Sequence, residues 1–182
     1  MYQISYSMAE LNGIELNILK EGLDAVKEQM RDPERNRRLN MRRARVSWVG
    51  GLKARVKTGN GVFTVDESLG PEPSETPTAV EYLLGTLGAC IVIGFVYLAT
   101  IRGIRIHNIE TSLEGELDNI GTFLALSDSG HSGYKRISLT LYVDADAEEE
   151  KLKEIFRETL KRSPLVNTLR NIVELEGNIK VV

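Results

Sequence analysis

The sequence predicts an α+β protein in which antiparallel strands precede and follow one long, buried helix. Residues 80–101 form an apolar run in which Glu81 is the one formal charge. Short segments that alternate apolar and polar residues lie on both sides of this run. The helical and strand patterns occur in blocks, as they do in α+β folds.

Size and composition set the broad class of the protein. The chain has 182 residues, a net charge of −3 and a single cysteine. A net negative charge argues against a general nucleic-acid binder, and one cysteine excludes an intrachain disulfide and a cysteine-rich zinc site. We expect no metal and no cofactor. The first residues lack a signal-peptide pattern, so a reducing, cytoplasmic location is the default expectation.

The apolar run has two interpretations. It is long enough to span a bilayer, and its small residues would suit close helix packing there. A central helix buried on all sides of a soluble fold explains the same pattern. We favour the soluble fold and expect no membrane association, because a lone span would place the two sets of strands on opposite sides of a membrane.

The first 40 residues read as an N-terminal helical extension with a basic connector, and residues 41–182 as the main domain. Apolar residues recur at helical spacing from about Asn12 to Arg31, and Pro33 ends the pattern. An arginine-rich run follows. It is interpreted as a solvated or salt-bridged connector, and the alternative is a contact surface for an acidic partner. The run comprises Arg35, Arg37, Arg38, Arg42, Arg43 and Arg45.

Residues 44–65 predict a three-stranded antiparallel meander. Alternation over 44–48, 52–57 and 62–65 is interrupted by Gly50-Gly51 and by Gly59-Asn60-Gly61, which suit hairpin turns. Basic residues share one face, which we expect to be solvated.

The long helix should begin near Thr76 as N-cap, after a linker with Pro71 and Pro73, and should end at Gly103. Strands are then expected from Ile104 to Leu117, with a bulge near Asn108, and over 137–143.

Two helical pieces and a strand complete the expected order. Asp146 and Glu149 resemble a capping box at the start of the first piece. Ser163-Pro164 should end it, because the residue before proline avoids helical angles. The tail from Asn178 to Val182 predicts a final edge strand.

Cys90 lies within the apolar run, where it serves either packing or chemistry in a dry pocket. Buried free cysteines are usually inert. A reactive one needs its thiolate form, which a nearby cation or hydrogen-bond donor favours. Lys53 and Arg55, on the basic face of the meander, are the candidate cations.

Glu81 also has two interpretations. A glutamate in the first turn of a helix interacts favourably with the helix dipole. Alternatively, its carboxylate orients a cation over the thiol pocket. Nine residues of helix rise separate Glu81 from Cys90 by about 13–14 Å, so any joint role requires an intermediary.

These residues resemble the OsmC/Ohr family of osmotically inducible and organic-hydroperoxide-resistance proteins. The matching stretch runs from Glu81 through Leu83-Leu84-Gly85-Thr86-Leu87-Gly88-Ala89 to Cys90. Residues 114–118, 141–161 and 163–169 are also similar, so the resemblance covers about 43–182.

The resemblance implies an intertwined homodimer with two central helices wrapped by sheets and with pockets at the subunit interface. It also implies a thiolate that attacks a hydroperoxide and becomes a sulfenic acid, after which a second cysteine closes a disulfide that dithiols reduce. An arginine from the first hairpin and a glutamate at the helix start hold the thiolate ready.

The sequence departs from that pattern at three positions. Ser163 replaces the second cysteine, Leu52 stands where the arginine belongs, and Val80 aligns with the family's glutamate. The resemblance therefore implies a one-cysteine peroxidase that uses Cys90, an external dithiol and an apolar organic hydroperoxide. Lys53 or Arg55 would favour the thiolate, Glu81 would order that cation, and Leu83 and Leu87 would line the pocket. The alternative is a non-catalytic binder of an apolar small molecule in the same pocket.

Overall fold

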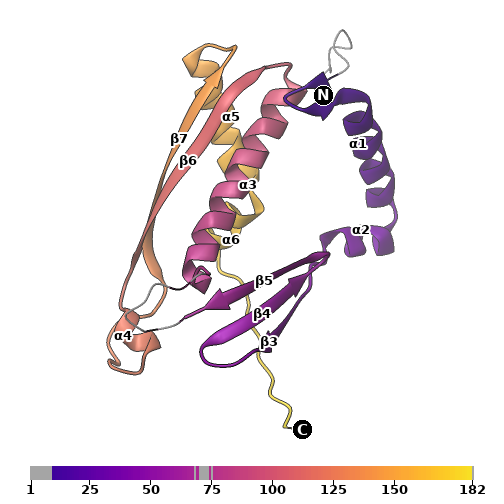
Figure 1. Cartoon of the computed structure of the whole chain (residues 1–182). Coiled ribbons are helices and arrows are strands. Elements are labelled where there is room, and N and C mark those ends of the chain that lie inside the picture. Colours follow the sequence, from indigo (N-terminus) through magenta and orange to yellow (C-terminus); the bar gives the residue numbers. More distant parts are fainter. Residues whose placement is uncertain (1–9, 68, 70–73, 75, 182) are drawn as a thin grey trace. The chain divides into compact units, whose positions relative to one another are not determined.

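The computed structural model describes residues 10–67, 69, 74 and 76–181 (Figure 1). It confirms the α+β fold, with small antiparallel sheets and one long helix. The chain forms two compact units that meet in the sequence between Thr86 and Leu87. Each is described by itself.

The first unit opens with a small hairpin in place of the first turn of the expected helix. Strands β1 (Glu10–Leu11) and β2 (Ile14–Glu15) pair across Asn12 and Gly13, both at positive φ. Asn-Gly is the commonest signal for such a turn. Helix α1 therefore covers Leu16–Arg31, and the predicted start at Asn12 was four residues too early.

The basic connector contains a helix that the sequence analysis missed. Helix α2 (Pro33–Asn40) begins after Asp32, whose carboxylate accepts a hydrogen bond of 2.9 Å from the Arg35 amide. Pro33 occupies the first turn, where no amide donor is needed. Glu34 pairs with Arg37 and Arg38 on the helix surface. The expected salt-bridged connector is thus present, in helical form.

The meander is confirmed as strands β3 (Ala44–Trp48), β4 (Lys53–Thr58) and β5 (Gly61–Asp66). Arg45 lies opposite Lys57, and Ser47 lies opposite Arg55. Because side chains alternate across a strand, these residues share one face. The other face is apolar, with Val46, Val56 and Phe63 in neighbouring positions.

Helix α3 (Ala79–Ile101) is the long helix, and Thr78 rather than Thr76 caps its start. The Thr78 hydroxyl accepts from the Glu81 amide at 3.3 Å, and the Glu81 carboxylate accepts from the Thr78 amide at 2.8 Å. This reciprocal pair is a capping box. The predicted end at Gly103 is confirmed. Its φ is +72° and its amide donates to Thr100. Pro71 and Pro73 lie outside the described residues.

The second unit contains a long hairpin of strands β6 (Ile106–Leu117) and β7 (Tyr134–Ala145). Its register shifts between Ile106 and Asn108, which confirms the predicted bulge. The connection carries the short helix α4 (Ile120–Phe123). Helices α5 (Glu149–Arg162) and α6 (Pro164–Arg170) follow, and their boundary at Ser163 confirms the predicted break.

Two predictions for this unit were wrong. Asp146 does not cap α5, whose N-cap is Glu148 without a side-chain bond. Asp146 instead lies 2.6 Å from the ring Nε2 of His107, across the hairpin. The tail forms no strand over the described residues 178–181, and nothing described pairs with it. A strand requires a partner edge to satisfy its backbone groups.

The core of the second unit lies where α3 packs on the β6–β7 hairpin and on α5 (Figure 1). Ile91, Phe95 and Ile155 have no exposed surface. A Cβ atom at Gly88 would lie only 2.8 Å from Leu113, and one at Gly94 only 3.2 Å from Thr159. The small residues of α3 therefore allow close approach within this unit.

Candidate functional site

The structure places two of the predicted site residues side by side. Sγ of Cys90, on α3, lies 3.2 Å from Oγ of Ser163, between α5 and α6. Cys90 is half-buried and Ser163 is 5% exposed. Both residues belong to the second unit. A distance of this size permits a hydrogen bond to sulfur in either direction.

Ser163 is held in place by the two helices that it joins. Its amide donates to Thr159 in the last turn of α5 at 2.8 Å, and its hydroxyl accepts from the Val166 amide in α6 at 3.3 Å. Asn167 donates its side-chain amide to the Ser163 carbonyl at 2.8 Å. Because the hydroxyl oxygen already accepts from Val166, its proton can be directed toward Cys90.

The surroundings of the pair are apolar. Leu87, Ile91 and Val166 form a buried apolar cluster. Leu87 and Ile91 lie within three residues of Cys90 in the sequence, and Val166 lies three residues after Ser163. Leu87 and Val166 also border a cavity of about 300 Å³, whose wall includes Ile137, Leu139 and Leu160. Low polarity strengthens any hydrogen bond made to the sulfur. Leu87 borders this cavity, whereas Leu83 belongs to the first unit and is 37% exposed.

Lys53 is already engaged in the first unit. Its ammonium lies 2.9 Å from the carboxylate of Asp66, which is only 2% exposed. The Ser74 hydroxyl donates to the same carboxylate at 2.7 Å. A buried carboxylate requires a partner of opposite charge or hydrogen-bond donors. Lys53 therefore has a structural role that the sequence analysis did not anticipate.

Arg55 lies two residues further along β4. Its neighbours across the sheet are Ser47 and Thr64. Within the described part of the chain, its guanidinium makes no ion pair or hydrogen bond. Of the two predicted cations, Arg55 is the one that has no such partner.

Glu81 is exposed and serves the capping box of α3. Hydrogen bonds from the amide and the hydroxyl of Thr78, each 2.8 Å, lower the pKa of the Glu81 carboxyl. The pattern of threonine followed three residues later by glutamate was visible in the sequence. This accounts for Glu81 as a helix-capping residue.

The sequence analysis missed two further residue pairs, Lys53–Asp66 and His107–Asp146. Asp66 ends β5, and its position opposite Lys53 follows from the hairpin register. That register was predictable from the Gly59-Asn60-Gly61 turn. His107 and Asp146 are 39 residues apart and meet through the β6–β7 pairing. No local signal in the sequence indicates that pair.

Comparison with known proteins decides the family. A family model described as "OsmC-like protein" matches residues 72–177, which is more than half of the chain. The chain belongs to the OsmC-like family.

Solved structures agree on the fold of this OsmC-like protein. An OsmC-like protein from Mycoplasma pneumoniae is 19% identical, with a TM-score of 0.63 over 73% of this chain and 89% of that one. An organic hydroperoxide resistance protein from Legionella pneumophila is 15% identical, with a TM-score of 0.53 over 72% and 90%. An OsmC-like protein of unknown function from Vibrio cholerae is 13% identical, with a TM-score of 0.58 over 71% and 93%. No curated protein sequence matches the chain.

Family membership also decides between the two interpretations of the apolar helix. Helix α3 is long and apolar enough to cross a membrane. The family model includes the whole of α3, and members of the family are soluble proteins. Eight of its residues are buried, including Leu87, Ile91 and Phe95. Helix α3 is therefore the core helix of a soluble OsmC-like fold.

Proposed function

We propose that this OsmC-like protein reduces organic hydroperoxides through Cys90 and draws its electrons from an external dithiol. The observation that carries the proposal is the distance of 3.2 Å between Cys90 Sγ and Ser163 Oγ. Ser163 stands where the family resemblance places a second cysteine. The hydroxyl therefore lies within reach of the sulfur but cannot form a disulfide with it. A structural relative from Legionella pneumophila carries the name organic hydroperoxide resistance protein, which supports the substrate class.

In the first step, the Cys90 thiolate attacks one oxygen of the hydroperoxide. The S–O bond forms as the O–O bond breaks, and the second oxygen leaves with a proton as the alcohol. The sulfur is oxidised by two electrons to a sulfenic acid, and the hydroperoxide is reduced. The Ser163 hydroxyl lies 3.2 Å from the sulfur, close enough to donate a hydrogen bond to it during this step.

In the second step, the external dithiol takes the place of the missing cysteine. One of its thiols attacks the oxidised sulfur, forms a mixed disulfide and releases water. The second thiol of the reductant then attacks the mixed disulfide. This releases the Cys90 thiolate, and the reductant leaves as a cyclic disulfide. Until the dithiol arrives, Cys90 is exposed to further oxidation.

We propose a cytoplasmic homodimer as the active form. Large apolar side chains lie open to solvent in each of the two units, and three of them serve as examples. Ile93 on α3 is 68% exposed, Val46 is 59% exposed and Trp48 is 77% exposed. Large apolar surfaces of this kind are typical of protein interfaces, and a second copy of the chain is the occupant that the family resemblance implies.

A non-catalytic binder of an apolar small molecule is the second candidate. The 300 Å³ cavity beside Leu87 and Val166 favours it, because its size is at the lower end of the range for ligand pockets. In that case Cys90 would have only a packing role.

The deciding experiment measures consumption of cumene hydroperoxide with dihydrolipoamide or dithiothreitol as reductant. We expect turnover in wild type, and none in Cys90→Ser or in wild type alkylated beforehand. Wild type without turnover, whose Cys90 stays reduced after exposure to the hydroperoxide, would contradict the proposal and favour the binder. Binding of a fluorescent fatty acid to wild type and Cys90→Ser alike would support that second candidate.

A further inference from the structure

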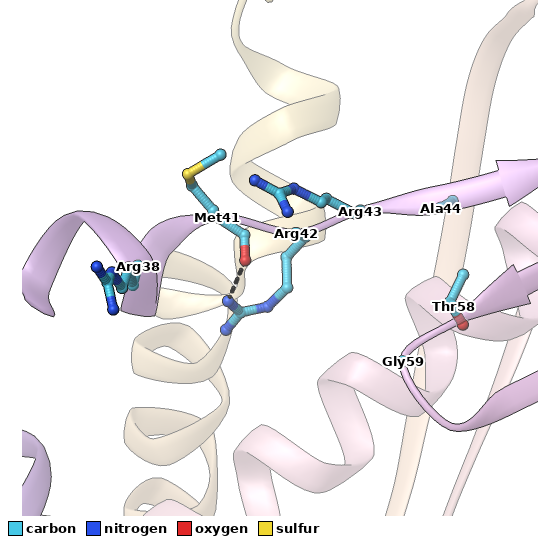
Figure 2. A pocket seen from close by; sticks show the side chains of 7 residues that line it. All are labelled: Arg38, Met41, Arg42, Arg43, Ala44, Thr58 and Gly59. Atoms are coloured by element: carbon cyan, nitrogen blue, oxygen red, sulfur yellow. Dashed lines mark hydrogen bonds between the residues drawn. The ribbon is translucent and has the colours of Figure 1, made fainter.

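A hollow lined by arginines lies at the junction of α2 and the meander, within the first unit. Figure 2 shows the side chains of α2, of the segment after it and of the β4–β5 turn around this space. Its volume is about 820 Å³, and none of the described residues that line it is acidic. We call it the arginine pocket. Its lining consists of Arg38, Met41, Arg42, Arg43, Ala44, Thr58 and Gly59.

Helix α2 is what brings these arginines together. Arg35 and Arg38 are three residues apart and therefore lie on one face of the helix. Arg42 follows just beyond its C-terminal cap. A second hollow of about 570 Å³ adjoins the first, since Arg38 and Arg42 line both, and Arg35 borders it. Four guanidinium groups thus surround one continuous region of surface.

Only some of these four arginines make contacts that stabilise the folded chain. Arg38 pairs with Glu34 at 3.3 Å, and Nη1 of Arg42 donates to the carbonyls of Leu39 and Met41 at 2.6 and 2.9 Å. The side chains of Arg35 and Arg43 make no ion pair or hydrogen bond within the described ranges. Arg42 is therefore held in position by backbone acceptors, with its remaining N–H groups available, while Arg43 contributes an unneutralised cation.

The charge balance of the segment supports a ligand. Nine of the 23 lysines and arginines lie between residues 33 and 66, but only two of the 26 carboxylates do. On the neighbouring sheet face, Arg45 lies directly opposite Lys57. Like charges in that arrangement destabilise a sheet. Residues 33–66 make up less than a fifth of the chain, so the positive charge is concentrated on a short segment. A bound anion would offset the repulsion between these cations.

We propose that the arginine pocket binds a compact anion carrying phosphoryl groups. Guanidinium groups donate paired hydrogen bonds that match phosphate oxygens, and Thr58 adds a hydroxyl donor to the lining. A long nucleic acid is disfavoured, because no described residue that lines the hollow is aromatic. Stacking on aromatic rings is the usual means of holding unpaired bases. The acidic remainder of the chain would also repel an extended polyanion.

The test uses calorimetric titration of the full chain with sodium tripolyphosphate, ATP and inorganic phosphate in about 150 mM salt, where weak surface attraction is screened. Arg43→Gln and Arg45→Gln form a matched pair, because each removes an exposed cation that has no ion pair among the residues the structure describes, and the two positions are two residues apart. Only Arg43 lines the pocket. We expect tripolyphosphate to bind wild type and Arg45→Gln alike, and Arg43→Gln to lose about 10-fold in affinity.

Arg42→Lys is the second variant. It keeps the charge but lacks the planar fork, so we expect a loss of several-fold. Tighter binding of ATP than of tripolyphosphate would identify the phosphoryl source as a nucleotide, and equal binding would identify a free polyphosphate. Three outcomes would overturn the proposal: no saturable binding of any of the three anions, equal losses in Arg43→Gln and Arg45→Gln, or displacement of tripolyphosphate by a single-stranded oligonucleotide with higher affinity. Thermal unfolding of each variant verifies that its fold is intact.

Discussion

The Cys90–Ser163 pair of the second unit and the Lys53–Asp66 pair of the first unit are similar in one respect. In each, a candidate catalytic side chain meets an almost completely buried partner, Ser163 at 5% and Asp66 at 2% exposure. They differ in what the partner does. A neutral hydroxyl leaves the nucleophilicity of sulfur intact, whereas a carboxylate neutralises the cation. Whether a candidate side chain is available for chemistry therefore depends more on the partner that it contacts than on its own residue type.

The strongest way to alter the first pair is to restore the missing thiol. In Ser163→Cys, the introduced sulfur would lie close to Cys90 Sγ, since the oxygen it replaces is 3.2 Å away. We expect the hydroperoxide to convert the variant to an intramolecular disulfide, while wild type gains oxygen on the sulfur. Intact-mass spectrometry distinguishes the loss of two hydrogens from the gain of oxygen.

Ser163→Ala is the matched control, because it removes the hydroxyl without adding a thiol. It should gain oxygen as wild type does, and it should lose about 1 kcal/mol of stability because Ser163 also caps α6. Two free thiols in Ser163→Cys after treatment with hydroperoxide would mean that Cys90 is not reactive.

The second pair is best tested by comparing two truncations on β4. Lys53→Ala leaves the buried Asp66 carboxylate without its cation, so we expect a loss of about 1–3 kcal/mol in the free energy of unfolding. Arg55→Ala removes a cation without an ion pair in the described structure, and its effect should stay within about 0.5 kcal/mol. Urea unfolding measures both. Equal losses would show that the Lys53–Asp66 contact adds nothing to stability.

The smallest expected effect concerns Glu81. The Thr78 hydrogen bonds lower the pKa of its carboxyl in the folded state. A lowered pKa stabilises the folded state above the unfolded value, near 4.5, and this contribution disappears as pH falls through the lower, folded value. Glu81→Gln should therefore be slightly less stable than wild type at neutral pH and equal to it in strong acid. Thermal unfolding from pH 7 to pH 3 measures the difference. If the difference in stability between wild type and Glu81→Gln does not change with pH, the ionised Glu81 carboxylate is not its cause.

Regular alternation made the strands predictable. The meander and the β7 strand follow directly from apolar and polar residues at period two, and the Asn108 bulge from a change of phase. Helix α2 escaped prediction because it has almost no apolar residues. Its start depends on Asp32 as N-cap and on Pro33 in the first turn. This local signal was overlooked because the segment is rich in arginine and was interpreted as a connector.

Contacts distant in sequence could not be derived from local patterns. Asp146 has the spacing of a capping residue, yet His107 engages it through the pairing of two strands. The proximity of Ser163 to Cys90 was implied only by the family resemblance, because 73 residues separate them. Asp66 is an exception, because the turn between β4 and β5 fixes the register that places it opposite Lys53, which was selected for its charge alone.

The tail after α6 has a practical consequence. Four apolar side chains within residues 172–181 are at least 90% exposed, and no described strand pairs with them: Ile172, Leu175, Ile179 and Val181. A protease can bind such an extended segment without unfolding anything. Lys180 is a trypsin site within this segment. Cleavage after Lys180 therefore reports on assembly, since a second copy that covers the tail would slow the cut as protein concentration rises.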